Sequence, residues 1–332
     1  MKHSIGKIIG GSLLGAIAGF FAPMTLLGAN PVIGVAATWL YAWAGIVPAG
    51  VFAVTGMAVA HLLGGNILLA GYALAVLVPA AAALAAIRLH KKYKTCMRIS
   101  VFTQIGAVVL ALGLAWGVLK TDLVDLLMSN MEMSFRLLPT EVLNAMFNVN
   151  SGVGGILGRI ELLGVLDSFL EYVEEVFKVG LAGMLLSNSI LTGVLNVAVP
   201  VWVWARSGDE RGIRRVPVSD WRVPESAAIG LPVCLLIGFI LNQTGYPGGD
   251  AVYFAIQMVF QLFLQFQCMG VFSRYAKKSG GSMFMRALLV IGALTFASTI
   301  AVYIGAFSLY LGSQGLITTF IRNRKKNHGE DE

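Results

Sequence analysis

The sequence predicts an all-α fold: a polytopic transmembrane helical bundle of about eight to nine spans, with one extracytoplasmic amphipathic helical segment. Hydrophobic residues make up 57% of the chain and charged residues only 12%, whereas soluble domains contain about 25% charged residues. Residues 8–87 contain no Asp, Glu, Lys or Arg. As a helix, this run would measure about 120 Å, enough for about four crossings of a hydrocarbon core of about 30 Å. The alternating segments of a transmembrane β-barrel are absent, so helices are the spanning structure.

The first charge-free run divides at turn and helix-breaking signals. These are Asn30-Pro31, Pro48 and Gly64-Gly65-Asn66, and they predict spans over residues 6–28, 32–46, 49–63 and 67–87. The second and third spans are short, so half-helices or tilted pieces kinked at Pro48 are alternatives. Five later charge-free runs are each long enough for a span: residues 99–119, 179–205, 226–249, 251–273 and 287–321.

The last of these runs is longer than one span and leads into a charged tail, residues 322–332. A single crossing leaves the basic tail outside. A re-entrant turn at Gly305 or Gly312 returns it to the cytoplasm, and both alternatives stay open.

Three short loops concentrate the Lys and Arg residues: 88–98, 206–222 and 274–286. Short basic loops stay in the cytoplasm, which predicts a multi-pass protein of the bacterial plasma membrane with a cytoplasmic N-terminus. The intervening loops at residues 28–31, 63–66 and 243–249 contain no Lys or Arg, as expected of the outer face.

The segment 120–178 falls outside by the same alternation, and it holds nine acidic residues against four basic ones. Apolar residues recur in it at helical spacing, which predicts an amphipathic helix lying on or against the membrane. They are Leu162, Leu163, Leu166, Phe169, Leu170, Val173, Val176 and Phe177. Leu123, Leu126, Leu127 and Met131 predict a second helix, with a flexible joint at Gly152 to Gly155. The predicted regions are therefore residues 1–119, 120–178, 179–321 and 322–332.

The sequence lacks the residue patterns that several classes of protein function require. The chain has no HExxH, GxSxG or Walker-type motif, and its three cysteines are single. We therefore expect no enzyme activity, no cofactor and no metal site. The basic residues form short blocks and no continuous groove, so nucleic acid is not an expected partner. No charged residue lies in the middle of a predicted span, which disfavours a proton-coupled pump, although uncharged sites bind Na⁺ or neutral solutes.

Amide side chains are the polar residues of interest within the spans. Gln257, Gln261 and Gln265 recur every four residues and share one helix face. One interpretation is that they form hydrogen bonds between helices. The other is that they line a solute cavity, joined by three asparagines on the preceding spans, Asn188, Asn196 and Asn242.

Gly11, Gly15 and Gly19, called the glycine ridge below, lie on one face of the first span. Small residues at this spacing let helices approach closely. Such a ridge packs inside its own bundle or, where exposed, docks another membrane subunit.

The stretch Leu195–Pro224 resembles the YybS-like family of uncharacterised bacterial membrane proteins. In that family an Asn-containing span ends in Arg, a basic loop follows, and a Trp-Arg-x-Pro-like entry opens the next span. The matching residues here are Asn196, Arg206, Trp221, Arg222 and Pro224. Gln267-Cys268-Met269-Gly270 is similar to the family's Gln-Gly at the end of the following span, with Cys-Met inserted. The resemblance covers about residues 185–322.

The YybS-like family is distantly similar to the substrate-binding S components of energy-coupling-factor vitamin transporters. S components bind a small solute and depend on an ATPase and a coupling subunit, which a small-residue ridge on the first span contacts. The resemblance therefore implies a non-enzymatic solute-binding or transport component, with membrane-protein partner subunits docked on the glycine ridge. The alternative function is a membrane scaffold or envelope assembly factor that uses its outer segment and basic loops. Both place the protein in the lipid bilayer.

Overall fold

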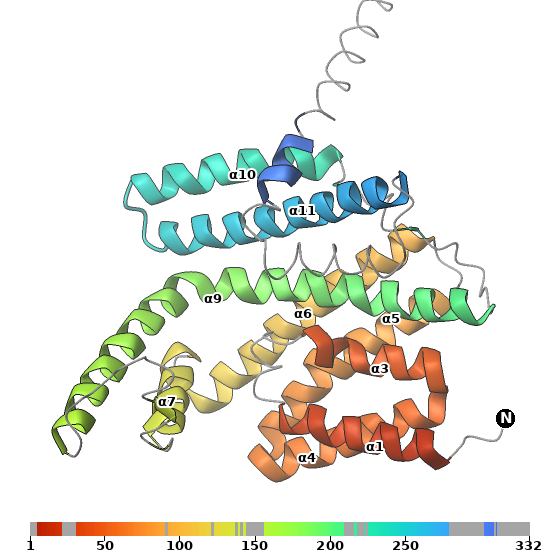
Figure 1. Ribbon diagram of the computed structural model, residues 1–332, viewed down its shortest axis with the longest axis horizontal. Helices are drawn as coiled ribbons and strands as arrows, with labels where there is room; N and C mark the ends of the chain where they lie inside the picture. The colour runs from red at the N-terminus through yellow and green to blue at the C-terminus, as the bar shows by residue number, and fades with distance from the viewer. Residues whose placement is uncertain are drawn as a thin grey trace, which may run out of the picture. The chain divides into compact units, whose positions relative to one another are not determined.

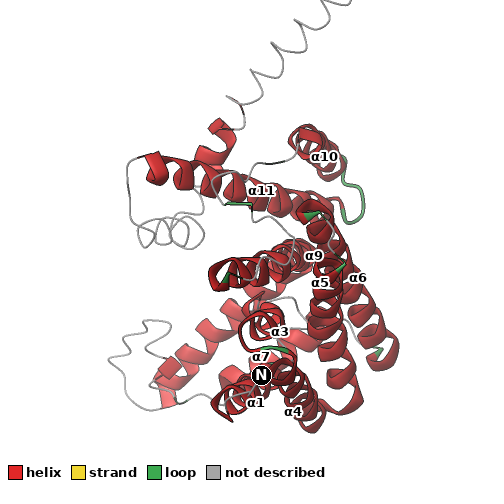
Figure 2. Ribbon diagram, turned by 90° about the vertical axis from the view of Figure 1, so that its right-hand side faces the viewer, coloured by secondary structure: helices red, strands yellow, loops and turns green. Residues whose placement is uncertain are grey.

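The computed structural model describes residues 5–21, 31–89, 92–120, 123–136, 139, 142–143, 156–208, 216–217, 223, 225–278, 302–308 and 310. Within these ranges all regular secondary structure is helical (Figures 1 and 2). The all-α class is confirmed. The chain divides into two compact units, Met1–Arg211 and Gly212–Glu332, and each is described by itself.

The first unit contains most of the helices. In chain order these are α1 (Ile5–Phe20), α3 (Pro31–Ala44), α4 (Ile46–Tyr72), the π-helix η1 (Ala73–Leu77), α5 (Val78–Arg88), α6 (Tyr93–Leu119), α7 (Leu123–Arg136) and α9 (Ile156–Ser207). The second unit contains α10 (Glu225–Gln243), α11 (Gly249–Lys278) and the short helical stretch 302–308.

Each predicted span from the first through residues 251–273 contains a helix within its described residues. Among the described residues, five helical stretches are long and apolar enough to cross a membrane: Ile46–Leu63, Leu68–Arg88, Tyr93–Val118, Leu163–Ser207 and Gly249–Lys278. Shorter apolar helices occupy Ile5–Phe20, Ile33–Ala44 and Ala227–Gln243. Most of the predicted span 287–321, the joint at Gly152 to Gly155 and the tail 322–332 lie outside the described residues.

Helices α1 and α4 pack closely side by side and run in the same direction (Figure 1). Gly11 lies against Pro48, where an added Cβ atom would be 2.6 Å from the carbonyl oxygen, and Gly19 lies against Gly56. The contacted residue of α4 moves from Pro48 to Gly56 as the contacting residue of α1 moves from Gly11 to Gly19. The two helices are therefore parallel. Only residues without a side chain allow so short a distance between two helix backbones.

The chain reverses direction within α4, at Gly65. This residue has a φ of +62°, in the left-handed region. Gly56 and Tyr72 would be about 24 Å apart in a straight helix, yet a Cβ atom on Gly56 would lie 2.6 Å from Cζ of the Tyr72 ring. The predicted break at residues 64–66 is therefore confirmed, and α4 contains two antiparallel arms.

The predicted kink at Pro48 is wrong, because the break lies three residues earlier. Gly45 separates α3 from α4 with a φ of +95°. Pro48 then falls in the first turn of α4, where the missing N–H of proline removes no intrahelical hydrogen bond.

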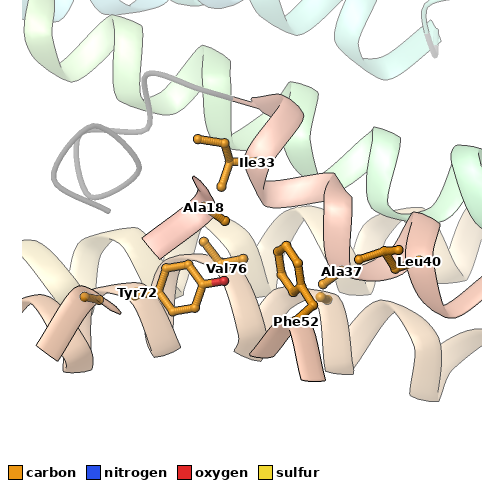
Figure 3. Packing of buried hydrophobic residues seen from close by; sticks show 9 residues of the cluster. Ala18, Ile33, Ala37, Leu40, Phe52, Tyr72 and Val76 are labelled. Atoms are coloured by element: carbon orange, nitrogen blue, oxygen red, sulfur yellow. The ribbon is translucent and has the colours of Figure 1, made fainter. Parts of the chain in front are cut away.

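A common apolar core joins the N-terminal helices of the first unit (Figure 3). Its side chains come from α1, α3, both arms of α4, η1 and α5. The members are Ala18, Ile33, Ala37, Leu40, Phe52, Ala60, Tyr72, Val76 and Ala80. Because many of these residues are small, the helices approach closely around the larger rings of Phe52 and Tyr72.

Helix α9 is one continuous helix of 52 residues, which corresponds to about 78 Å. The sequence predicted an amphipathic helix ending near residue 178 and a separate span from residue 179. This division into two helices is wrong, because α9 has no break at that position. The Glu174–Lys178 ion pair, at 2.5 Å, stabilises the helix up to the predicted boundary, and no proline occurs before Pro200. Figure 1 shows α9 as a single bent helix.

The N-terminal part of α9 is amphipathic, as predicted, and part of its apolar face packs on α7. Leu166 is fully buried, and the rings of Phe135 and Phe169 meet edge to face at 5.9 Å. Arg136 of α7 forms an ion pair with Asp167 at 3.2 Å. The acidic face of this segment stays exposed to solvent.

In the second unit, α10 and α11 form a helical hairpin. Helix α10 ends at Gln243, earlier than the predicted span 226–249, because Gly245 and Gly248 adopt positive φ values of 67° and 75° and turn the chain. The stretch 302–308 packs tightly on α11, since a Cβ atom on Gly305 would lie 2.8 Å from the carbonyl carbon of Leu264.

Candidate functional site

Helix α9 is held between α3 and α6 at two close crossings. A Cβ atom on Gly34 of α3 would lie 2.6 Å from Cγ2 of Thr192, and one on Gly193 would lie 2.6 Å from Cα of Val101 in α6. Consecutive residues of α9 therefore contact different helices. Three polar side chains on this stretch, Ser189, Thr192 and Asn196, are buried.

Asn196 of α9 is completely buried beside Thr38 of α3. The Thr38 hydroxyl donates to Asn196 Oδ1 at 3.1 Å and to the carbonyl oxygen of Val35 at 2.9 Å, so its single proton is shared between two acceptors. Asn196 Nδ2 has no partner among the described residues. Whichever way the amide is turned, Thr38 engages one of its two polar atoms and leaves the other with hydrogen-bonding capacity.

Gln104 of α6 reaches the π-helix η1. Its Nε2 donates to the carbonyl oxygen of Ala75 at 2.9 Å, and the side chain is 4% exposed. A π-helical turn displaces carbonyl groups from the regular α-helical pattern, and such turns are frequent at functional sites. Gln104 Oε1 has no partner within the described part of the chain.

Six buried side chains on α3, α6 and α9 are called the buried polar layer below. They are Thr38, Ser100, Gln104, Ser189, Thr192 and Asn196. Ser100 Oγ has no partner among the described residues, and the same holds for two other hydroxyls of the first unit, Tyr72 Oη and Ser187 Oγ. Each buried polar atom left without a hydrogen bond costs about 1–3 kcal/mol. Hydroxyl and amide groups supply both donors and acceptors and carry no charge, so this chemistry suits a small neutral polar molecule.

The predicted amide residues are distributed over both units. Asn188 is half-buried on α9, in the same helix as Asn196. The second unit contains the others, all half-buried: Asn242 near the end of α10 and Gln257, Gln261 and Gln265 on α11. The cavity that was expected to combine these residues stays a prediction.

Sequence reasoning missed Thr38, Ser100 and Gln104 as candidate site residues. Ser100 and Gln104 lie with Thr103 at the start of the charge-free run 99–119, whereas Thr38 is a single polar residue within an apolar stretch, and this isolation was its available signal. It is a weak signal, since the hydroxyl of a serine or threonine in a membrane helix usually donates a hydrogen bond to a backbone carbonyl of the same helix.

Gln267 of α11 illustrates an amide with a structural role. Its Oε1 accepts the backbone N–H of Val223 at 3.0 Å, and its Nε2 donates to Ser308 Oγ at 3.2 Å. Both ends of the amide are used. Gln267 therefore links three segments of the second unit and keeps no polar atom for a ligand.

The glycine ridge is covered by α4 and does not form a free docking surface. Gly11, Gly15 and Gly19 are all buried, and a Cβ atom on Gly15 would overlap Thr55 Oγ1 and lie 2.9 Å from Cα of Phe52. The expectation that the ridge contacts a separate subunit is therefore wrong. The alternative that it packs inside its own bundle is confirmed.

Comparison with known proteins places the chain in a family. No curated protein and no solved structure matches it. The model of a family described as predicted membrane protein (DUF2232) matches residues 12–308, which extends from α1 into the stretch 302–308 and includes helices of both units. The chain therefore belongs to this DUF2232 family of predicted membrane proteins.

Proposed function

We propose that the protein is a non-enzymatic, membrane-embedded component that binds a small neutral polar solute and depends on partner subunits for transport. The observation that carries this proposal is Asn196, a fully buried amide within a membrane helix, whose Nδ2 atom has no hydrogen-bond partner among the described residues. Polar groups in hydrocarbon are costly, so a residue of this kind usually has a partner, and a bound solute would provide one.

The resemblance to YybS-like proteins supports the same proposal, because that family is distantly similar to S components of energy-coupling-factor transporters. Asn196 belongs to the stretch that carries the resemblance. Because α4 covers the glycine ridge, a coupling subunit would need to use another surface of this chain.

The test measures bound solute and folding in the same preparations. Wild-type protein purified in mild detergent is expected to release a polar small molecule on denaturation, detected by mass spectrometry. Asn196→Leu should remain folded yet retain at least about a hundredfold less of that molecule, since the polar group of the bound solute would then be left without its hydrogen-bond partner. Gln104→Leu, measured in parallel, tests a second member of the buried polar layer.

Gln267→Leu is the matched control, because it removes an amide whose two ends are already bonded within the chain. This variant should lower the melting temperature and keep the solute. A wild type that carries no solute, or an Asn196→Leu protein that retains it, would contradict the proposal. Loss of the solute in Gln261→Leu instead would assign the site to α11 of the second unit.

A scaffold or envelope assembly function is the second candidate, and the length of α9 favours it. At about 78 Å, this helix exceeds the thickness of a hydrocarbon core of about 30 Å. Its N-terminal part presents exposed acidic residues, among them Asp167 with 59% of its side chain exposed. An affinity purification that recovers envelope proteins with the wild type and loses them when α7 and the start of α9 are deleted would support this function.

A further inference from the structure

A positive charge lies beside an exposed tryptophan at one end of the first unit. The Nζ atom of Lys7 on α1 is 5.2 Å from the centre of the Trp43 ring at the end of α3, and Trp39 stacks on Trp43 at 5.4 Å. Because Gly11 lies against Pro48, Lys7, one turn earlier, is level with the start of α4. Lysine and tryptophan together are typical of the headgroup level of a membrane.

A shallow, open apolar groove begins at this same level on the surface of the first arm of α4, and the described residues that line it all belong to this helix. Its volume is about 380 Å³, and its lining residues are Ile46, Val47, Gly50, Val51, Val54 and Thr55. Gly50 borders open space, since a Cβ atom there would meet nothing within 4 Å. From residue 46 to residue 55 the groove follows about 14 Å of helix, close to half of a hydrocarbon core of about 30 Å.

The surrounding helices provide no carboxylate to neutralise Lys7. Residues 1–121 contain no Asp or Glu, so α1, α3, α4, α5 and α6 have only neutral and basic side chains. Arg88, at the end of α5, adds a second positive charge at this end of the unit, where its guanidinium lies 5.1 Å from the centre of the Tyr41 ring. The ends of helices contribute partial charges of about half a unit, which leaves the formal positive charge in place.

We propose that this end of the first unit binds one anionic phospholipid, with its phosphate at Lys7 beside Trp43 and one acyl chain in the α4 groove. The ammonium group of Lys7 pairs with the phosphate as a point charge, and Trp43 lies at the polar boundary of the bilayer. The groove offers aliphatic walls to the chain. Anionic headgroups are bound at basic sites between transmembrane helices in this way.

The dimensions of the groove favour a lipid over a partner helix. An acyl chain occupies one leaflet, which is the length that the groove provides, whereas a transmembrane helix would need a surface along the whole hydrocarbon core. The groove also begins at the level of Lys7, whose positive charge complements a phosphate. This site is separate from the buried polar layer, so it does not depend on the proposed solute-binding function.

Native mass spectrometry of the full-length protein tests the proposal. The protein is equilibrated with equal amounts of phosphatidylglycerol and phosphatidylcholine of identical acyl chains, and the retained lipids are counted after transfer from mixed micelles. Wild type should retain one phosphatidylglycerol preferentially. Lys7→Gln should reduce this retention about fivefold, as expected for one cation near the membrane surface. Gly50→Leu fills the groove and should abolish retention of the tightly bound lipid.

Matched variants separate the site from general effects of charge and volume. Lys120→Gln removes an exposed cation directly after the C-terminal end of α6. Gly106→Leu adds a side chain at another glycine where a Cβ atom would meet nothing within 4 Å. Both should retain phosphatidylglycerol as the wild type does. Melting temperatures confirm folding, and Val47→Trp blocks the groove from its rim if Gly50→Leu fails to fold.

Three results would overturn the proposal. They are equal retention of the two lipids by the wild type, unchanged retention when the groove is filled, and displacement of the lipid by excess inorganic phosphate. The last result would assign Lys7 to a free anion, because a lipid anchored by its acyl chain resists exchange with phosphate alone.

Discussion

At the scale of single residues, neighbouring glycines of α1 have different roles that depend on what surrounds them. A Cβ atom on Gly15 would overlap α4, whereas one on Gly10 would meet nothing within 4 Å. The absence of a side chain is therefore required at one position and dispensable at the other. In a membrane, where lipid is as apolar as leucine, such close backbone contact is a main source of helix association.

Gly15→Leu is expected to destabilise the folded protein by about 1–3 kcal/mol or more, because the added side chain cannot fit between α1 and α4. Gly10→Leu should leave stability nearly unchanged. The measurement is the thermal unfolding of both variants in the same detergent. Equal melting temperatures for the two variants would show that the α1–α4 packing is not close in solution.

At the scale of elements, turns and helix ends in this chain depend on glycine conformation more than on charge. Gly65 reverses α4 with a positive φ, although the run around it contains no Asp, Glu, Lys or Arg. Helix α9 behaves in the opposite way: a strongly charged segment continues into an apolar one without a break. A change in polarity marks the edge of the hydrocarbon, and a helix continues across that edge wherever the backbone stays helical.

Gly65→Ala is expected to cost about 1–2 kcal/mol, because a residue with a Cβ atom is strained in the left-handed region. Gly106→Ala should have the opposite sign, a gain of up to about 1 kcal/mol, since Gly106 lies within regular helix α6 with free space around it. Chemical or thermal unfolding of both variants measures the difference. A Gly65→Ala protein as stable as the wild type would exclude a strained reversal there.

At the scale of the whole molecule, aromatic contacts bring the basic ends of several helices of the first unit together. Tyr41 of α3 contacts Arg88 at the end of α5 and packs edge to face on Trp204 of α9 at 6.1 Å, while Trp43 contacts Lys7. The start of α1 and the ends of α5 and α9 therefore lie at one end of this unit. The charge pattern independently predicts that they share a side of the membrane.

Which side this is stays a prediction, and cysteine labelling tests it. In a background without Cys96, Cys234 and Cys268, Glu171→Cys on the exposed face of α9 should react with an impermeant thiol reagent in intact spheroplasts. Lys94→Cys, exposed at the start of α6, should react only after lysis. The reverse pattern would invert the topology.

The sequence by itself determined the class of the fold and the approximate location of most helices. Long charge-free runs are too apolar for a water-soluble fold. Breaks such as residues 64–66 are encoded locally by glycine. The amphipathic character of the start of α9 was equally predictable, since periodicity is a property of one segment. Asn196 was identified as a candidate from its amide within a predicted span, although Gln104, an amide in another predicted span, was missed.

The tertiary structure alone decided which surfaces meet. It showed that the glycine ridge is covered by α4, that Thr38 and Asn196 are partners across 158 positions of sequence, and that Lys7 of α1 lies beside Trp43 of α3. Hydropathy could not predict these contacts, because lipid and protein interior are equally apolar. The choice of helix neighbours depends instead on the fit of small residues and single polar groups between segments that are distant in the chain.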